Sequence, residues 1–185
     1  MVIVCLGDSL TEGAGVLPEQ CWVSLLQSGS RHRWLNAGIS GDTSLGMLVR
    51  LQTQVLPAKP DMVIWLGGYN DILLTGSADQ AKSCVMAFLN HCVKAGVKPV
   101  IGIPYLPRGV GRPWNKLCDW EACAPVLEEY IRWLRKLAKA ALLRYVDFAP
   151  AGTLLQSDGM HPTAQGHVAM AEAAAASGYF KEAPL

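Results

Sequence analysis

Short apolar runs alternate along this chain with longer stretches whose apolar residues recur at helical spacing. The apolar and β-branched runs, most of them stopped by Gly or Pro, predict strands at residues 2–6, 34–37, 62–66, 97–103 and 145–148. The helical spacing predicts helices at 20–28, 45–56, 79–95, 121–143 (with a break at Pro125) and 163–176. Continuously apolar strands that alternate with helices are typical of a parallel sheet covered on both faces. The pattern therefore predicts a three-layer α/β/α sandwich with a flavodoxin-like, five-stranded parallel sheet.

Length and composition agree with a single globular domain over residues 1–185. Hydrophobic residues make up 51% of the chain and charged residues only 17%, which argues against disorder. The net charge is +1 and the Lys and Arg residues are scattered, so nucleic acid is not an expected partner. No apolar run is long enough to span a bilayer, and the first residues lack the basic region of an export signal. We therefore expect no integral membrane segment and a cytoplasmic location.

The six cysteines form no C-x-x-C pair and have no ligand cluster around them. We expect reduced, buried thiols, except that Cys118 and Cys123 fall in a loop-like region and are candidates for exposure. No metal or organic cofactor is called for.

Polar and titratable residues gather where the predicted strands end. They follow four of the five strands, at residues 7–13, 38–43, 67–71 and 158–162. In open parallel sheets, ligands bind outside the carboxyl ends of the strands. The sequence therefore predicts that these segments meet at one edge of the sheet and form a site.

Ser9, Asp158 and His161 have the chemistry of a nucleophile, an orienting acid and a base. A serine hydroxyl needs a base to take its proton, and a histidine base needs an acceptor that fixes its tautomer. Asp158 and His161 are three residues apart, and Pro162 keeps His161 out of the following helix. The alternative is that neither motif is catalytic, because a Gly-Asp-Ser turn is common and a lone histidine before proline is usually structural. The remaining histidines fit the role less well. His32 and His91 are expected at the surface, and so is His167, for which a supporting place behind the site is the alternative.

Acyl transfer also needs donors for the oxyanion. The Asn70 side-chain amide can supply one donor, although an Asn-Asp pair after a strand is often only a turn or helix cap. Gly41 has no side chain to block its N–H, and the Ser9 N–H stands at a predicted helix entry. Ser9, Gly41 and Asn70 are therefore the expected oxyanion hole.

Taken together, four blocks of this sequence resemble the GDSL lipase/esterase family, also called the SGNH hydrolases. They are Gly-Asp-Ser-Leu at 7–10, Asn-Ala-Gly-Ile-Ser-Gly-Asp-Thr at 36–43, Gly-Tyr-Asn-Asp at 68–71, and Asp-Gly-Met-His-Pro at 158–162. The resemblance implies a flavodoxin-like fold, Ser9 as nucleophile, Asp158 and His161 as its partners, and Gly41 and Asn70 in the oxyanion hole. The blocks are most similar to the bacterial arylesterase, acyl-CoA thioesterase and lysophospholipase subgroup. That subgroup usually reads Gly-Gly-Asn-Asp, whereas Tyr69 here intervenes between Gly68 and Asn70.

Substrate specificity is expected in the loops beyond the strand ends. The long loop at 104–119 is either a substrate wall or a plain connector. Arg108 and Arg112 within it are candidate contacts for an anionic substrate group. The expected substrate-binding residues are Tyr69, Ile72, Tyr105, Arg112 and Trp114.

The predicted function is a serine esterase or thioesterase that hydrolyses small to medium acyl esters through an acyl-enzyme on Ser9. Small-molecule aryl esters, acyl thioesters and lysophospholipids are the expected substrates. A carbohydrate acetylesterase on the same machinery, with Trp114 or Trp120 lining a shallow cleft, is an alternative. A flavodoxin-like module that binds flavin or nucleotide without catalysis is another, but Asp8 and Glu12 would repel a phosphate near Ser9.

Overall fold

A computed structural model of the chain describes residues 1–108 and 118–180 and contains one parallel sheet. The strands are β1 (Val2–Gly7), β2 (Arg33–Gly38), β3 (Met62–Leu66), β4 (Lys98–Ile103) and β5 (Arg144–Asp147). Their spatial order is β2-β1-β3-β4-β5, and every neighbouring pair is parallel. The predicted flavodoxin-like, five-stranded parallel sheet is confirmed.

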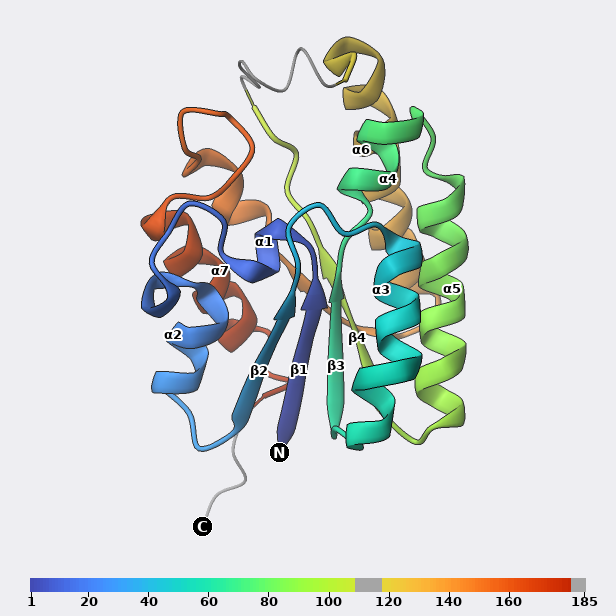
Figure 1. The fold of residues 1–185 in the computed structure, drawn as a ribbon, viewed down its shortest axis with the longest axis vertical. Coiled ribbons are helices and arrows are strands. Elements are labelled where there is room, and N and C mark those ends of the chain that lie inside the picture. The colour runs from blue at the N-terminus through green and yellow to red at the C-terminus, as the bar shows by residue number, and fades with distance from the viewer. Residues whose placement is uncertain (109–117, 181–185) are drawn as a thin grey trace.

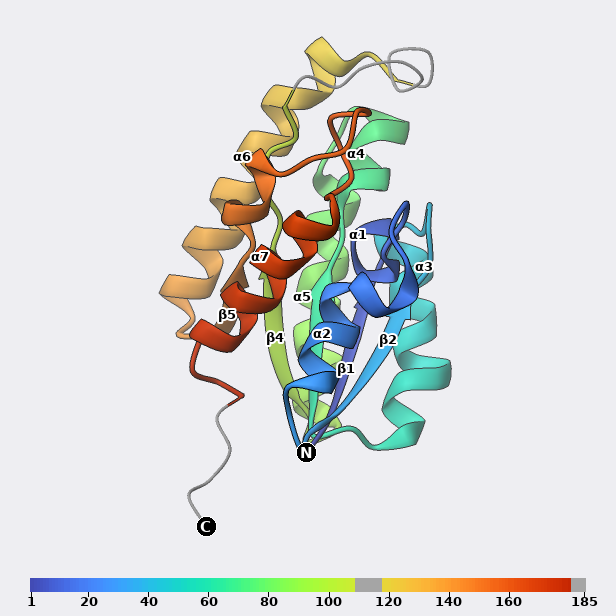
Figure 2. The ribbon, with the colours of Figure 1, turned by 90° about the vertical axis from the view of Figure 1, so that its left-hand side faces the viewer.

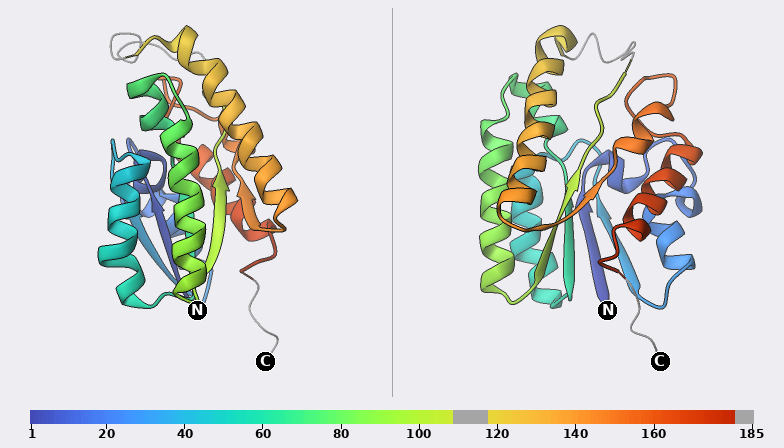
Figure 3. Two further views of the ribbon diagram at one scale, coloured as in Figure 1. Left: turned by 90° about the vertical axis from the view of Figure 1, so that its right-hand side faces the viewer. Right: turned by 180° about the vertical axis from the view of Figure 1, so that it is seen from behind.

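Helices cover both faces of this sheet (Figures 1 and 2). The helices are α1 (Ser9–Glu12), α2 (Trp22–Ser28), α3 (Ser44–Arg50), α4 (Tyr69–Thr75), α5 (Asp79–Lys94), α6 (Trp120–Ala140) and α7 (Ala164–Ala176). The helices α2 and α7 pack on one face, and α3, α5 and α6 pack on the other, as the two views in Figure 3 show. The three-layer α/β/α arrangement follows, with the carboxyl ends of the strands at one edge.

Several helices differ from the predicted ones. The helix predicted at 45–56 is α3, which ends at Arg50 and continues as a π-helical turn at Leu51–Val55. The helix α6 runs through Pro125 without the expected break, and Asp119 caps its first turn by accepting a hydrogen bond from the Ala122 N–H at 3.3 Å. The sequence predicted a helix entry at Ser9 but no bounds for α1, and it did not predict α4; both short helices stand at the carboxyl edge of the sheet.

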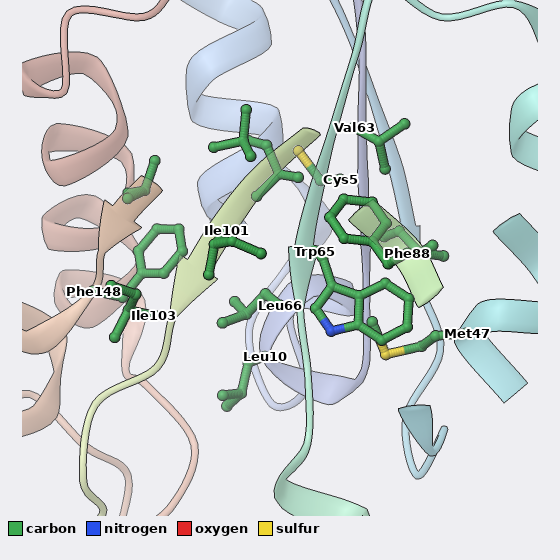
Figure 4. Close-up of a cluster of buried hydrophobic side chains, with 14 of the residues drawn as sticks. Cys5, Leu10, Met47, Val63, Trp65, Leu66, Phe88, Ile101, Ile103 and Phe148 are labelled. Carbon is green, nitrogen blue, oxygen red and sulfur yellow. The ribbon is translucent and has the colours of Figure 1, made fainter. Parts of the chain in front are cut away.

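The core is densest around the central strands (Figure 4). All residues of β3 are buried, and the Trp65 ring lies 5.1 Å from the Phe88 ring of α5. On the other face, Phe148 lies 5.2 Å from the Trp22 ring of α2. Burial of each such side chain stabilises the fold by about 1.5–3 kcal/mol. The central strands therefore give the site a rigid base.

Two of the histidines expected at the surface are buried instead. His167 has no exposed surface, and its Nδ1 accepts a hydrogen bond from the Trp22 N–H at 3.4 Å. His32 is buried as well, and its Nε2 lies 3.1 Å from the Phe180 carbonyl oxygen. Backbone partners let both rings enter the interior, and the sequence pattern does not reveal such partners. His91 is partly exposed, with its Nε2 3.0 Å from the Gln52 amide nitrogen.

The six cysteines are free thiols. Cys123 is not in a loop but in the first turns of α6, where it is buried, and Cys118 is partly buried. Within the described ranges, no helix has the length and apolar character needed to cross a membrane.

Candidate active site

The structure brings Ser9, His161 and Asp158 into one hydrogen-bonded chain at the carboxyl edge of the sheet. The Ser9 Oγ lies 2.9 Å from His161 Nε2, and His161 Nδ1 lies 2.6 Å from Asp158 Oδ2. The imidazole thus spans the hydroxyl and the carboxylate, one ring nitrogen facing each. This is the geometry in which a histidine can remove a serine proton while the carboxylate supports the resulting charge.

Asp158 also organises the turn that carries His161. Its second oxygen, Oδ1, accepts hydrogen bonds from the Met160 N–H at 2.9 Å and the His161 N–H at 3.0 Å. Gly159, between Asp158 and Met160, has a φ of 71°, which favours glycine. Burial alone would raise the pKa of Asp158, but the bonds from the His161 ring and the two N–H groups lower that pKa below its usual value. The carboxylate is therefore held in its charged, accepting form.

Residues 156–162, here called the triad turn, are fastened to the body by long-range bonds. The Gln156 amide nitrogen donates to the Ala14 carbonyl at 2.9 Å, and within the turn it also donates to the Pro162 carbonyl at 2.8 Å. The buried Tyr105 hydroxyl donates to the Met160 carbonyl at 2.7 Å. These bonds tie the turn to the segment after α1 and to the end of β4. They therefore fix the position of His161 relative to Ser9.

Asp8 is the N-cap of α1 and thereby orients Ser9, the first residue of that helix. Its Oδ1 accepts from the Leu10 N–H at 3.0 Å as the helix cap, and its side chain is buried. Burial raises the pKa of Asp8 to about 7; the Leu10 bond opposes this rise, and the nearby Asp42 and Asp71 carboxylates add to it. Asp8 is thus a buried acid directly behind the nucleophile.

Residues 38–43, here called the oxyanion loop, follow β2 beside Ser9. At its start, Gly38 lies against α1, where a Cβ would come within 2.1 Å of the Glu12 backbone nitrogen. Gly41 has a φ of 80° in open space, so its backbone conformation, and not crowding, favours glycine. Across the site, the Asn70 side-chain nitrogen donates to the Asp42 carbonyl at 2.8 Å. An amide nitrogen carries two protons, so this bond orients Asn70 and leaves a second N–H for a substrate oxygen.

A single cation, Arg50 of α3, holds the oxyanion loop against the sheet. Its guanidinium donates to Asp42 Oδ2 through Nε at 2.9 Å and Nη2 at 2.6 Å. The same group donates to the Ala37 carbonyl at 2.7 Å and the Gly7 carbonyl at 3.1 Å, at the ends of β2 and β1. Arg50 and Asp42 side chains are only 12% and 13% exposed, so the pair is shielded from solvent. Arg50 therefore joins three segments of the site.

Asp71, beside Asn70, supports the far end of the oxyanion loop. Its Oδ2 accepts from both the Ser44 N–H and the Ser44 hydroxyl, each at 2.9 Å, at the first residue of α3. At the start of α4, Gly68 has a φ of 109°, and a Cβ there would meet the Tyr130 ring at 2.5 Å. The Asn-Asp pair thus contacts two segments: Asn70 binds the oxyanion loop and Asp71 binds the start of α3.

The expected substrate-binding residues have mixed outcomes. Ile72 is fully buried in the core of the described structure, so we no longer expect it to contact substrate. Tyr69 and Tyr105 are also buried, and their rings lie edge to face at 6.3 Å, which makes them supports beneath the site. Arg112 and Trp114 lie outside the described residues.

Sequence reasoning missed three residues that position the site. Arg50 holds the oxyanion loop, Gln156 the triad turn and Ser44 the start of α3. None of them stands in a motif whose chemistry is visible locally. Among residues 1–108 and 118–180, no cluster of three or more His, Cys, Asp or Glu side chains has the arrangement of a metal site.

Comparisons with known proteins agree with this geometry. The sequence profile of the GDSL-like Lipase/Acylhydrolase family matches residues 5–169. Esterase TesA of Pseudomonas aeruginosa is 29% identical over 167 residues, which cover 86% of this chain and 79% of that protein. Thioesterase 1/protease 1/lysophospholipase L1 of Escherichia coli is also 29% identical over 167 residues, covering 86% of this chain and 74% of the relative.

The fold is likewise shared with solved structures. A lipolytic protein of the G-D-S-L family from Desulfitobacterium hafniense superimposes with a TM-score of 0.79 at 21% identity, covering 95% of this chain and 98% of that one. The profile match includes Ser9 and His161, and it spans most of the chain. The chain therefore belongs to the GDSL-like lipase/acylhydrolase family of hydrolases.

Proposed function

We propose that this hydrolase cleaves small to medium acyl esters or thioesters through an acyl-enzyme on Ser9. The observation that carries the proposal is the unbroken chain from Ser9 Oγ through His161 to Asp158, with contacts of 2.9 and 2.6 Å. A histidine in such a chain can act first as base and then as acid. Aryl esters, acyl thioesters and lysophospholipids are the proposed substrate classes.

In the first half of the reaction, His161 takes the Ser9 proton as Ser9 Oγ attacks the acyl carbonyl carbon. The carbonyl oxygen becomes an oxyanion, which the Ser9 and Gly41 N–H groups and the Asn70 amide stabilise. His161 then gives its proton to the departing alcohol or thiol. The C–O or C–S bond breaks and the acyl group stays on Ser9.

In the second half, a water molecule takes the place of the leaving group. His161 removes a proton from the water, which attacks the acyl-enzyme and forms a second oxyanion in the same hole. Collapse of this intermediate returns the proton from His161 to Ser9 and releases the carboxylic acid. The low pKa of Asp158 supports the proposal, because a charged Asp158 stabilises the imidazolium at both stages.

The test is a comparison of wild type and Ser9→Ala on p-nitrophenyl esters from acetyl to palmitoyl. We expect wild type to turn over at least one ester and Ser9→Ala to lose about 10⁴-fold or more in kcat. A burst of p-nitrophenol that matches the enzyme concentration would support the acyl-enzyme. Equal inertness of both proteins on every ester would overturn the proposal.

We further propose a cytoplasmic location. The support is chemical: five cysteines (Cys5, Cys21, Cys84, Cys92 and Cys123) are buried thiols outside disulfides, and such thiols are usual in reducing compartments. Cell fractionation with an antibody against the protein tests the proposal. Recovery in the membrane or extracellular fraction would contradict it.

A further inference from the structure

We propose that Tyr69 and Tyr105 act together as positioning residues that align Asn70 with His161. The inference rests on the proposed function and adds to it the side chains that hold the two halves of the site in register. Asn70 is the proposed side-chain donor to the oxyanion, and His161 is the proposed base. The two residues belong to different segments, α4 and the triad turn, so contacts between these segments must align them.

Tyr105 acts on the peptide unit that precedes His161. The Tyr105 hydroxyl donates to the Met160 carbonyl oxygen at 2.7 Å. The N–H of the same peptide unit, which is that of His161, donates to Asp158 Oδ1 at 3.0 Å. Because a peptide unit is planar, bonds at both of its polar ends fix its orientation. Burial raises the pKa of the Tyr105 hydroxyl well above its usual value, so the hydroxyl stays protonated and remains a donor.

The position of Tyr105 is itself set by two neighbours. The Tyr69 ring meets the Tyr105 ring edge to face, with 6.3 Å between the ring centres and 89° between the ring planes. This is one of the arrangements that aromatic pairs prefer. Gly152 also packs closely, since a Cβ there would come within 2.9 Å of the Tyr105 Cβ. A change at Tyr69 should therefore move the hydroxyl that holds the triad turn.

Tyr69 connects this arrangement to the oxyanion side of the site. It directly precedes Asn70 in the first turn of α4, and its buried ring fixes the backbone from which the Asn70 amide reaches the Asp42 carbonyl. Within residues 1–108 and 118–180 the Tyr69 hydroxyl has no hydrogen-bond partner, so the ring makes the link. The subgroup that this chain resembles usually has Gly at this place, and a glycine has no side chain to reach Tyr105.

The experiment measures kcat and KM of wild type and three variants on the p-nitrophenyl ester that wild type cleaves fastest. Tyr69→Leu removes the ring that meets Tyr105, and we expect kcat to fall about 30-fold with KM within about twofold of wild type. Tyr69→Phe keeps the ring, so its kcat should stay within about twofold of wild type. Tyr105→Phe keeps the ring pair but loses the donor to Met160, and its kcat should fall about tenfold.

Tyr69→Leu combined with Tyr105→Phe tests whether the two tyrosines act through one link. Residues that act through a shared contact are not additive. We therefore expect the combined variant to lose about as much kcat as Tyr69→Leu alone, about 30-fold, and not the product of the two single losses, about 300-fold.

The matched control is Phe88→Leu on α5, which removes a fully buried ring from another aromatic pair, with Trp65 at 5.1 Å. Thermal melting should show a loss of stability in both Phe88→Leu and Tyr69→Leu, but kcat of Phe88→Leu should stay within about twofold of wild type. Should Tyr69→Leu not fold, Gly152→Ala is the second test. Its methyl group would displace Tyr105, so kcat should fall about tenfold or more with KM little changed.

Three results would overturn the inference while leaving the proposed function intact. The first is a loss of kcat in Tyr69→Leu, or in Gly152→Ala where that variant replaces it, no larger than in Phe88→Leu. The second is a kcat of Tyr69→Phe as low as that of Tyr69→Leu, and the third is a combined variant in which the single losses multiply. Wild type that is inert on every ester would instead overturn the proposed function itself.

Discussion

The triad turn and the oxyanion loop stand on opposite sides of Ser9, and they are held in place in different ways. The triad turn is stabilised by many bonds, most of them between residues close in sequence, such as those from the Met160 and His161 N–H groups to Asp158. The oxyanion loop is held mainly by side chains from other segments: Asn70 donates to the Asp42 carbonyl, and Glu12 accepts from the Ser40 N–H. Arg50 makes four more bonds, to Asp42 and to the ends of two strands. Loss of one bond should therefore be tolerated in the triad turn more easily than loss of Arg50 in the loop.

The largest expected effect comes from Asp158, because it acts on both the turn and the chemistry. Asp158→Asn keeps the size of the side chain but can present an amide N–H to His161 Nδ1, which favours the wrong tautomer of the ring. We expect kcat on p-nitrophenyl butyrate to fall by about 10³–10⁴-fold with a small change in KM. The matched control is Asp147→Asn on β5, which alters the ion pair of Asp147 with Arg135 of α6. A loss of less than tenfold in Asp158→Asn would remove Asp158 from the mechanism.

The second-largest expected effect concerns the oxyanion loop. Arg50→Met leaves the shielded Asp42 carboxylate without its cation and removes the donors to Gly7 and Ala37. We expect a loss of about 3 kcal/mol in the free energy of unfolding. We also expect a fall of about 10²-fold in kcat with KM little changed, because the Gly41 N–H is no longer held toward the oxyanion. Urea denaturation and steady-state kinetics measure the two quantities.

A second variant separates positioning from stability. Arg50→Met combined with Asp42→Asn removes the uncompensated charge, so much of the stability should return while kcat stays low. Lys82→Met is the control, since its pair with Glu129 is exposed and should contribute less than about 1 kcal/mol. Recovery of kcat together with stability in the double variant would show that Arg50 is only structural.

Acid titration distinguishes two buried groups of the site, His167 behind the triad turn and Asp8 behind Ser9, because their contributions to stability change oppositely with pH. Burial lowers the pKa of His167, behind the triad turn, from 6.5 to about 4, with a smaller contribution from His161. Between these values the unfolded chain binds a proton that the folded chain does not, so stability falls as pH falls. The pKa of Asp8, raised from 3.8 to about 7, works the other way: the folded chain binds the proton, so stability falls as pH rises.

The two contributions should nearly cancel in wild type between pH 4.5 and 6.5. Each amounts to about 2 kcal/mol over that window. The free energy of unfolding of Asp8→Asn should therefore rise with pH, and that of His167→Gln should fall with pH. Urea denaturation at the two pH values measures the slopes. Identical slopes in the two variants would mean that these groups do not titrate differently in the folded and unfolded chains.

The contrast between local and long-range contacts also explains how far the sequence could predict the structure. The strands and the four motif blocks were predictable because periodicity and short motifs are local, and parallel strands bring their carboxyl ends together. The short helices α1 and α4 span too few residues for a helical period to be visible. Arg50 is separated from Gly7 by 43 residues and Gln156 from Ala14 by 142, so no local pattern marks their contacts. Burial of His167 likewise depends on a partner, Trp22, from another helix.

The smallest expected effect is in the triad turn itself. Gln156→Met removes the side-chain donor to the Ala14 and Pro162 carbonyls, but the backbone bond from the Gln156 N–H to the His161 carbonyl at 2.8 Å remains. Asp158 and Tyr105 also keep their bonds to the turn. We therefore expect a loss of only about 1 kcal/mol in stability and at most about tenfold in kcat. If Gln156→Met lowered kcat as much as Arg50→Met does, the triad turn would depend on Gln156 as strongly as the oxyanion loop depends on Arg50, and the difference between the two regions would not hold.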